Sequence, residues 1–126
     1  MNDLVIVFIA VVLIGFGLLR RFLFGSPSVV SAARVQAALD EGAMVVDVRT
    51  PEEFAAGHYP GARNIPLDEI VARRDEVGKP SEVVVLYCAS GNRSGQAVAL
   101  LRRYGFVNLI NGGGLHHMPV RDTEME

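Results

Sequence analysis

The stretch Val83–Ser94 reads VVVLYCASGNRS and decides how the chain folds. Its strand-forming residues 83–87 run directly into Cys88, the only cysteine in the protein. A polar loop, Ala89–Arg93, follows, and an apolar, helix-compatible segment, Gln96–Tyr104, comes after it. This order predicts a buried strand that delivers a thiol to a short loop and then to the amino terminus of a helix.

The loop is suited to holding a thiolate. An ordinary cysteine has a pKa of about 8.5 and is mostly protonated at neutral pH. Backbone N–H groups from Ala89 through Ser90, Gly91 and Asn92 to Arg93 would form an anion-holding nest if the loop curls. A helix that begins near Ser94 points its positive end at the same place. The alternative interpretation is that Cys88 is a small buried hydrophobe.

Three side chains of this loop have more specific expected roles. Arg93 supplies a fixed positive charge and planar donors for an oxyanion. Gly91 permits a positive φ at the middle of the loop. Ser94 is expected to cap the helix or to donate its hydroxyl hydrogen to the sulfur.

Helices and strands alternate on both sides of this stretch. Ser31 is placed to cap a helix through Asp40, and Thr50–Glu53 is a capping box for a short helix that reaches about Ala56. Further elements are expected over 43–48 (strand), 64–65 (strand), 67–76 (helix) and 107–110 (strand). The alternation predicts an α/β domain with a mainly parallel central sheet flanked by helices.

Polar residues gather at the predicted carboxyl ends of two strands, where ligands bind in such sheets. Asp47 and Arg49 follow one strand and Cys88 ends another. We expect Asp47 to pair with Arg93 or a loop N–H group rather than act as a general base. For Arg49 two roles stay open: contact with a substrate anion, or pairing with Glu52 or Glu53.

The chain begins with an uncharged apolar run, residues 4–19, followed by Arg20, Arg21 and a further apolar triplet. A membrane-crossing helix needs about 20 apolar residues, so we expect residues 1–24 to be a transmembrane anchor rather than a signal peptide. The arginines then place the catalytic part on the cytoplasmic side. Residues 25–30 form a linker, 31–120 the α/β domain and 121–126 a tail.

The composition excludes several classes of protein. A net charge of −2 in 126 residues gives no argument for a nucleic-acid partner. A single cysteine cannot form an internal disulfide. No cluster with metal-ligand spacing is visible, so His116 and His117 are interpreted as solvated tail residues. We expect His58 to hydrogen-bond to backbone in the Gly57–Gly61 loop and Arg63 to face the pocket.

The sequence resembles the rhodanese domain family of sulfurtransferases, and the matching motifs are spread over roughly residues 30–115. They are Asp47–Arg49, Glu52–Phe54, Gly57–Ala62, Asn64–Pro66, Tyr87–Cys88, Arg93–Ser94, Gly105–Phe106 and Asn111–Gly113. Cys88 to Arg93 has the six-residue Cys-x4-Arg spacing of the sulfurtransferases, whereas relatives that act on phosphate or arsenate have one residue more.

The resemblance implies a rhodanese-like fold and a persulfide on Cys88, held by the backbone of residues 89–93. The implied reaction moves sulfane sulfur from thiosulfate or a persulfide to cyanide, a thiol or a protein acceptor, without a metal or organic cofactor. Two alternatives stay open: a non-catalytic or redox-sensing binding module at the membrane, and, with less support, a cysteine-dependent phosphatase. The chain departs from the family in lacking tryptophan and a long final helix.

Overall fold

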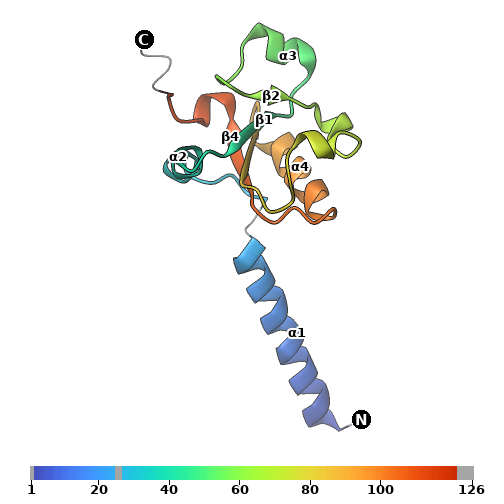
Figure 1. Ribbon diagram of the computed structural model, residues 1–126. Coiled ribbons are helices and arrows are strands. Elements are labelled where there is room, and N and C mark those ends of the chain that lie inside the picture. The colour runs from blue at the N-terminus through green and yellow to red at the C-terminus, as the bar shows by residue number, and fades with distance from the viewer. Residues whose placement is uncertain (1, 25–26, 122–126) are drawn as a thin grey trace.

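The computed structural model describes residues 2–24 and 27–121, with only the backbone described for 20–24. Two parts of the chain are visible in Figure 1: an α/β domain and a single helix, α1 (Asp3–Phe24), that extends away from it. The predicted linker residues 25–26 and tail residues 122–126 lie outside the described residues.

The domain is built on a four-stranded sheet in the order β2-β1-β3-β4, and all three pairings are parallel. This confirms the predicted α/β class. The elements that follow α1 are α2 (Ala32–Asp40), β1 (Met44–Asp47), α3 (Pro51–Ala56), β2 (Arg63–Asn64), the 3-10 turns η1 (Leu67–Glu69) and η2 (Arg74–Glu76), β3 (Val84–Cys88), α4 (Asn92–Arg102), β4 (Leu109–Gly114) and the 3-10 turn η3 (Leu115–His117).

The sheet is covered on both faces, which explains why its strands read as continuous apolar runs. Alternate residues of β3 point to opposite faces: Val85 and Tyr87 pack in the cluster under α2, whereas Leu86 and Cys88 pack in the cluster under α4. Figure 1 shows these two helices on opposite sides of the strands. The thiol therefore lies on the α4 face of the sheet.

Local sequence signals set most of the helix boundaries. The Ser31 hydroxyl accepts a hydrogen bond from the Arg34 N–H at 3.2 Å, which begins α2 as predicted. The Thr50–Glu53 capping box forms with both of its bonds and begins α3. Helix α4 begins at Asn92, two residues before the predicted start, and its cap is Gly91 rather than Ser94.

The predicted helix over 67–76 is wrong in type. Two separate 3-10 turns, η1 and η2, occupy this stretch, and the chain dips twice into the core, with Ile70 and Val77 both fully buried. Short 3-10 turns are common connectors, because they let a chain bend without a continuous helical ladder. Between β4 and residue 121, where the described part of the chain ends, the helical structure consists of the short turn η3.

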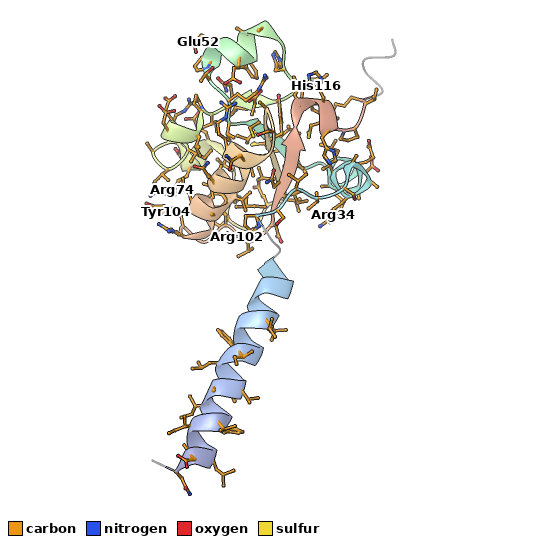
Figure 2. The ribbon with its side chains drawn as sticks, turned by 180° about the vertical axis from the view of Figure 1, so that it is seen from behind. Arg34, Glu52, Arg74, Arg102, Tyr104 and His116 are labelled. Carbon is orange, nitrogen blue, oxygen red and sulfur yellow. The ribbon has the colours of Figure 1, made fainter. Side chains whose placement is uncertain are left out.

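Helix α1 forms over the expected stretch, with its apolar side chains exposed to all sides (Figure 2). Within the described residues, no helix combines the length and the apolar character that a membrane crossing requires. The expected transmembrane anchor is therefore not supported.

Candidate active site

Cys88 is the last residue of β3 and its side chain is buried, with 1% of its surface exposed. The chain then turns through Ala89 and Ser90 to Gly91, which adopts a φ of 93° and caps α4. A side chain at Gly91 would be strained by this φ and would also meet a Val29 methyl at 2.5 Å. The prediction of a positive φ at Gly91 is confirmed.

Hydrogen-bond donors converge on the Cys88 sulfur from the loop and the first turn of α4. The Gly91 N–H donates to Sγ at 3.0 Å and the Ser94 N–H at 3.4 Å. The Ser94 hydroxyl oxygen also lies 3.4 Å from Sγ. These groups and the positive end of α4 favour a negative charge on the sulfur.

The balance of burial and hydrogen bonding lowers the pKa of the Cys88 thiol below its ordinary value. Burial acts in the opposite direction, because it disfavours the charged form. Hydrogen bonds from the Ser94 side chain and from the backbone of Ser94, Ser90 and Gly91 outweigh it. Within the part of the chain that the structure describes, no hydrogen bond joins the amides of Ala89, Asn92 or Arg93 to Sγ.

Arg93 does not face the sulfur as a free cation. Its guanidinium makes two parallel hydrogen bonds, at 2.7 and 3.0 Å, to the carboxylate of Glu53 at the start of α3. The paired guanidinium and the Thr50 backbone lower the pKa of Glu53 to about 2, so the pair is ionised at neutral pH. Arg93 still interacts electrostatically with Cys88. This role of Glu53 was not predicted from the sequence, because the capping box already explained a glutamate at this position.

Asp47 and Arg49 pair with each other, which corrects both expectations for them. The Arg49 Nη2 lies 2.7 Å from Asp47 Oδ2, and its Nε donates to both carboxylate oxygens. The Tyr87 hydroxyl donates to the same Oδ2 at 2.7 Å. Asp47 lies two residues before Arg49 at a strand end, so this short-range contact forms in place of the predicted pairs with Arg93 and with Glu52 or Glu53.

This Asp47 network is closed against solvent. Asp47 and Tyr87 are fully buried and Arg49 is 7% exposed. Hydrogen bonding to Asp47 raises the pKa of Arg49, while burial and then the bond to Asp47 raise the pKa of Tyr87. Arg49 also donates to the Gly57 carbonyl at 2.7 Å and thereby ties down the loop after α3. The network fixes the shape of the strand ends.

Histidines and Arg63 lie apart from the sulfur contacts. His58 Nδ1 is 3.1 Å from the Phe54 carbonyl, so its contact is with backbone as predicted but with α3 rather than with the Gly57–Gly61 loop. Arg63, expected to face the pocket, instead donates to the Glu76 carbonyl at 3.3 Å. His116 and His117 are both exposed, which agrees with their interpretation as solvated residues, and His117 Nε2 also lies 2.9 Å from the Val30 carbonyl.

Asn111 contacts the site, although the sequence analysis gave it no role. It is 1% exposed and its Oδ1 accepts a hydrogen bond from the Ser94 hydroxyl at 2.7 Å. The available signal was its position in the Asn111–Gly113 motif after a predicted strand. A buried asparagine beside a double glycine indicates that its side-chain amide forms hydrogen bonds with the neighbouring backbone.

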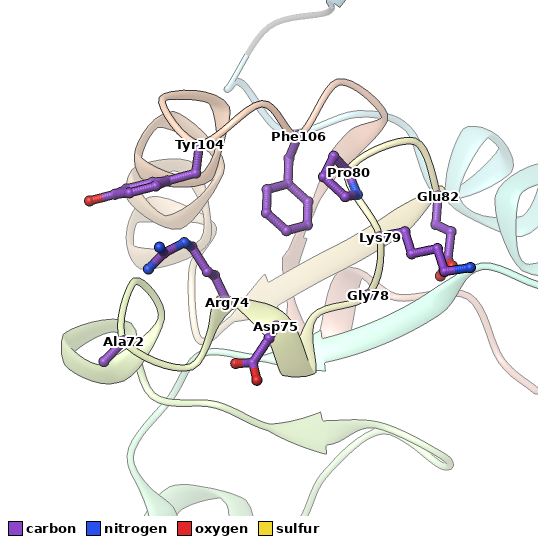
Figure 3. A pocket seen from close by; sticks show the side chains of 9 residues that line it. All are labelled: Ala72, Arg74, Asp75, Gly78, Lys79, Pro80, Glu82, Tyr104 and Phe106. Atoms are coloured by element: carbon purple, nitrogen blue, oxygen red, sulfur yellow. The ribbon is translucent and has the colours of Figure 1, made fainter.

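Two surface cavities differ in their relation to this site. The larger, of about 810 Å³, lies at the amino ends of β3 and β4, where Arg74 stacks on Tyr104 and Lys79 and Glu82 stand at the other side (Figure 3). The smaller, of about 520 Å³, lies at the carboxyl end of β1 and is lined by Thr50, Leu67 and Arg93 among others. Only the second borders the Cys88 loop. Within residues 2–24 and 27–121, no cluster of side chains is arranged to hold a metal ion.

Comparisons with known proteins give the site a family context. A protein from Bacillus subtilis, YqhL, described as uncharacterized, is 44% identical over 69 residues, which cover 55% of this chain and 54% of that protein. Thiosulfate sulfurtransferase PspE from Escherichia coli is 41% identical over 71 residues, which cover 56% of this chain and 68% of that protein.

Solved structures agree with the sequence relatives. A structure described as rhodanese with anions, from E. coli, is 39% identical, covers 60% of this chain and 93% of that chain, and has a TM-score of 0.57. The model of the rhodanese-like domain matches residues 31–115, from the cap of α2 to η3. This span contains the Cys88 loop, the Arg93–Glu53 pair and the Asp47 network, and the chain belongs to the rhodanese-like domain family.

Proposed function

We propose that this chain moves sulfane sulfur through a persulfide on Cys88. The enzyme class follows from the relatives: PspE is named a thiosulfate sulfurtransferase, and the chain is a sulfurtransferase of the rhodanese type. The observation that carries the proposed mechanism is the convergence of the Gly91 and Ser94 N–H groups on Sγ at the amino end of α4.

The first half-reaction loads the enzyme. The Cys88 thiolate attacks the outer sulfur of thiosulfate or of a persulfide, and a new S–S bond forms as the donor's own S–S bond breaks. With thiosulfate, the electron pair leaves with sulfite and a Cys88 persulfide anion remains. The loop residues Ala89, Ser90, Gly91, Asn92, Arg93 and Ser94 then hold the outer sulfur through backbone N–H groups and the positive helix end.

The second half-reaction unloads the enzyme. Cyanide or an acceptor thiolate attacks the outer sulfur, the Cys88 S–S bond breaks and the electron pair returns to the Cys88 sulfur. The result is a double-displacement cycle through a covalent intermediate. Neither half needs a metal or organic cofactor, because each is a displacement at sulfur in which the nucleophile supplies the electron pair of the new bond and the leaving group keeps the pair of the old bond.

The cavity beside Arg93 is the proposed approach route for donors and acceptors. It lies where β1 ends, and Arg93 is shared between its wall and the Cys88 loop. A guanidinium at this position attracts the anionic groups that sulfur donors carry. That the homologous E. coli rhodanese structure contains anions supports an anion-holding site in this family. The cavity also leaves room for a thiol presented by a protein.

Phosphatase activity is disfavoured by the same geometry. The Cys88–Arg93 loop is one residue shorter than the phosphatase pattern. No observation favours the binding-module alternative over catalysis. We place the catalytic domain in a reducing compartment, on the cytoplasmic side, because Cys88 must stay unpaired to act.

The test is the transfer of sulfur from thiosulfate to cyanide by the purified chain. We expect turnover by the wild type and by Lys79→Ala. Lys79 is a control because it lines the cavity of Figure 3, at the amino ends of β3 and β4. Cys88→Ser should reduce turnover to the uncatalysed rate. Equal turnover by Cys88→Ser and the wild type would overturn the proposal, and hydrolysis of an aryl phosphate that depends on Cys88 would favour the phosphatase alternative.

A further inference from the structure

A row of three side chains leads from the thiol to the far side of the loop. Cys88 Sγ lies 3.4 Å from the Ser94 hydroxyl oxygen, which in turn lies 2.7 Å from Asn111 Oδ1. Ser94 is fully buried and Asn111 is 1% exposed. A serine hydroxyl has one hydrogen, so it can serve only one of its two neighbours as donor at a time.

The orientation of the Asn111 amide settles which neighbour receives that hydrogen. Its Nδ2 donates to the Pro27 carbonyl at 2.7 Å and to the Gly91 carbonyl at 2.9 Å. Carbonyl oxygens only accept hydrogen bonds, so the NH₂ group must lie on this side and Oδ1 on the other. Oδ1 accepts from the Gly113 N–H at 3.0 Å and from the Ser94 hydroxyl.

The Ser94 hydroxyl therefore meets the neutral thiol as an acceptor. Its hydrogen points to Asn111, and the Cys88 S–H donates to the free lone pair of Oγ. After ionisation the sulfur can only accept, and the Ser94 hydrogen must turn from Oδ1 toward Sγ to stabilise the charge. Oδ1 then keeps the bond from Gly113, so Asn111 is not left without a donor.

We propose that Asn111 is a positioning residue that holds the Ser94 hydrogen away from Cys88 while the sulfur is protonated and competes for it when the sulfur ionises. The inference deepens the sulfurtransferase function proposed above and rests on it. No covalent bond changes in this step except that of the thiol proton, which leaves to water. The competition sets how readily the nucleophile forms and how readily the Cys88 thiolate leaves in the second half-reaction.

The amide is held in this orientation by a segment distant in sequence. Val30 N–H donates to the Asn111 carbonyl at 3.0 Å, and Val29 pairs with Asn111 along the edge of β4. Pro27 supplies the acceptor for Nδ2. The stretch 27–30, which lies between α1 and the domain, thus fixes Asn111 from outside while Gly91 fixes it from the loop.

Other charged groups near the thiol are kept constant in the test. They are Arg93 on α4 with its partner Glu53 on α3, the Asp47–Arg49 pair at the end of β1, and the titratable His117 on η3, whose ring lies beside Gly113. Substitutions at Asn111 and Ser94 remove none of these side chains. A change in the Cys88 pKa that depends on both residues therefore reports their shared hydrogen bond.

The experiment measures the pH dependence of Cys88 alkylation in four proteins: wild type, Asn111→Leu, Ser94→Ala and the double variant. Removing Oδ1 frees the Ser94 hydrogen for the thiolate, so Asn111→Leu should lower the pH midpoint of alkylation when Ser94 is present. This lowering should exceed the shift that the same substitution causes in the Ser94→Ala background by about one pH unit. An equal shift in both backgrounds would mean that Asn111 acts only on loop shape, and would overturn the proposal.

Asn111→Asp provides a second measurement at constant side-chain volume, in case the leucine variant does not fold. The carboxyl group keeps an acceptor for Ser94 but loses the paired donors to Pro27 and Gly91. The added charge disfavours the thiolate in either Ser94 background, so we expect a larger rise of the midpoint with Ser94 present than in Ser94→Ala, and an equal rise would contradict the proposal. Alkylation does not require sulfur transfer, so failure of this inference is distinguishable from failure of the proposed activity.

Discussion

The carboxyl ends of β1 and β3 lie side by side in the sheet, yet they carry two different kinds of polar site. At the end of β1, every strong donor around Asp47 is matched to a carboxylate oxygen, and the charge of Arg49 is neutralised inside the protein. At the end of β3, donors converge on one sulfur atom, and the nearby Arg93 makes its ion pair with Glu53 instead of with that sulfur. The hydrogen-bonding groups of the first site satisfy one another, whereas the donors of the second site are used fully only when the sulfur is charged.

This difference in hydrogen bonding distinguishes a structural site from a reactive site more clearly than the types of residue do. Both sites contain an arginine and both lie where ligands bind in parallel sheets. A buried ion pair with saturated hydrogen bonds has no capacity left for a substrate. Donors directed at a nucleophile, in contrast, are available to a charge that forms during the reaction. The following predictions test the two halves of this comparison.

The largest effect on stability is expected at the closed site. Asp47→Ala leaves the Arg49 charge buried without its partner, so the free energy of unfolding should fall by about 3–5 kcal/mol. Molecules that remain folded should keep their sulfurtransferase activity. Denaturant unfolding and turnover per folded molecule measure the two quantities, with the exposed Asp75→Ala as control. Lost activity at unchanged stability would place Asp47 in the chemistry instead.

The converse is expected for Arg93, which belongs to the open site. Its side chain and that of Glu53 are 32% and 35% exposed, so their pair contributes no more than about 1 kcal/mol to folding. Arg93→Ala should nevertheless lower kcat/KM for thiosulfate by about 100-fold, because an anion-stabilising charge is removed. Glu53→Gln keeps that charge and should remain active. An unstable but fully active Arg93→Ala would reverse the comparison.

Tyr87 tests whether the closed site acts through hydrogen bonding. Tyr87→Phe removes a donor to Asp47 and the acceptor for the Tyr59 N–H, which lies 2.9 Å from the hydroxyl. A buried group left unsatisfied costs about 1–3 kcal/mol. The free energy of unfolding should fall by that amount, whereas Tyr104→Phe, at an exposed position, should have no measurable effect. Equal stability of the two variants would show that the Asp47 network does not need Tyr87.

The smallest expected effect is a shift in the Cys88 pKa. The Ser94 hydroxyl lowers this pKa by donating to the thiolate, so Ser94→Ala should raise it by about one unit. Thiolate is present above the pKa, and the alkylation rate at neutral pH should therefore fall. Ser90→Ala, which leaves the loop backbone in place, serves as control. A lower pKa in Ser94→Ala would contradict the assigned direction of this bond.

Local patterns allowed the catalytic loop to be predicted from the sequence. Strand formers before Cys88, Gly91 in the loop and the capping box at Thr50 each act over a few residues, and the structure forms all three. The partner of Arg93 could not be found in this way, because Glu53 lies forty positions away and only the tertiary fold brings the two side chains together. The same holds for Asn111, whose contacts with Pro27 and Gly91 join three distant segments.

The expectation for 67–76 failed for a different reason. Apolar residues at Leu67, Ile70 and Val71 fit a helical face, but the same spacing suits short turns that return repeatedly to the core. The burial of both Ile70 and Val77 in the core favours the two 3-10 turns over a continuous helix. The transmembrane expectation rested on extending an apolar run past Arg20, and no helix in the described part of the chain meets the requirements of a span.

The most direct test of the account is intact-protein and peptide mass spectrometry after incubation with thiosulfate. The account predicts one additional sulfur atom on the peptide that contains Cys88, and its release as thiocyanate when cyanide is added. Cys88→Ser should show no such addition. An unmodified Cys88, or the same added mass in Cys88→Ser, would contradict the claim that the open site at the end of β3 carries a persulfide.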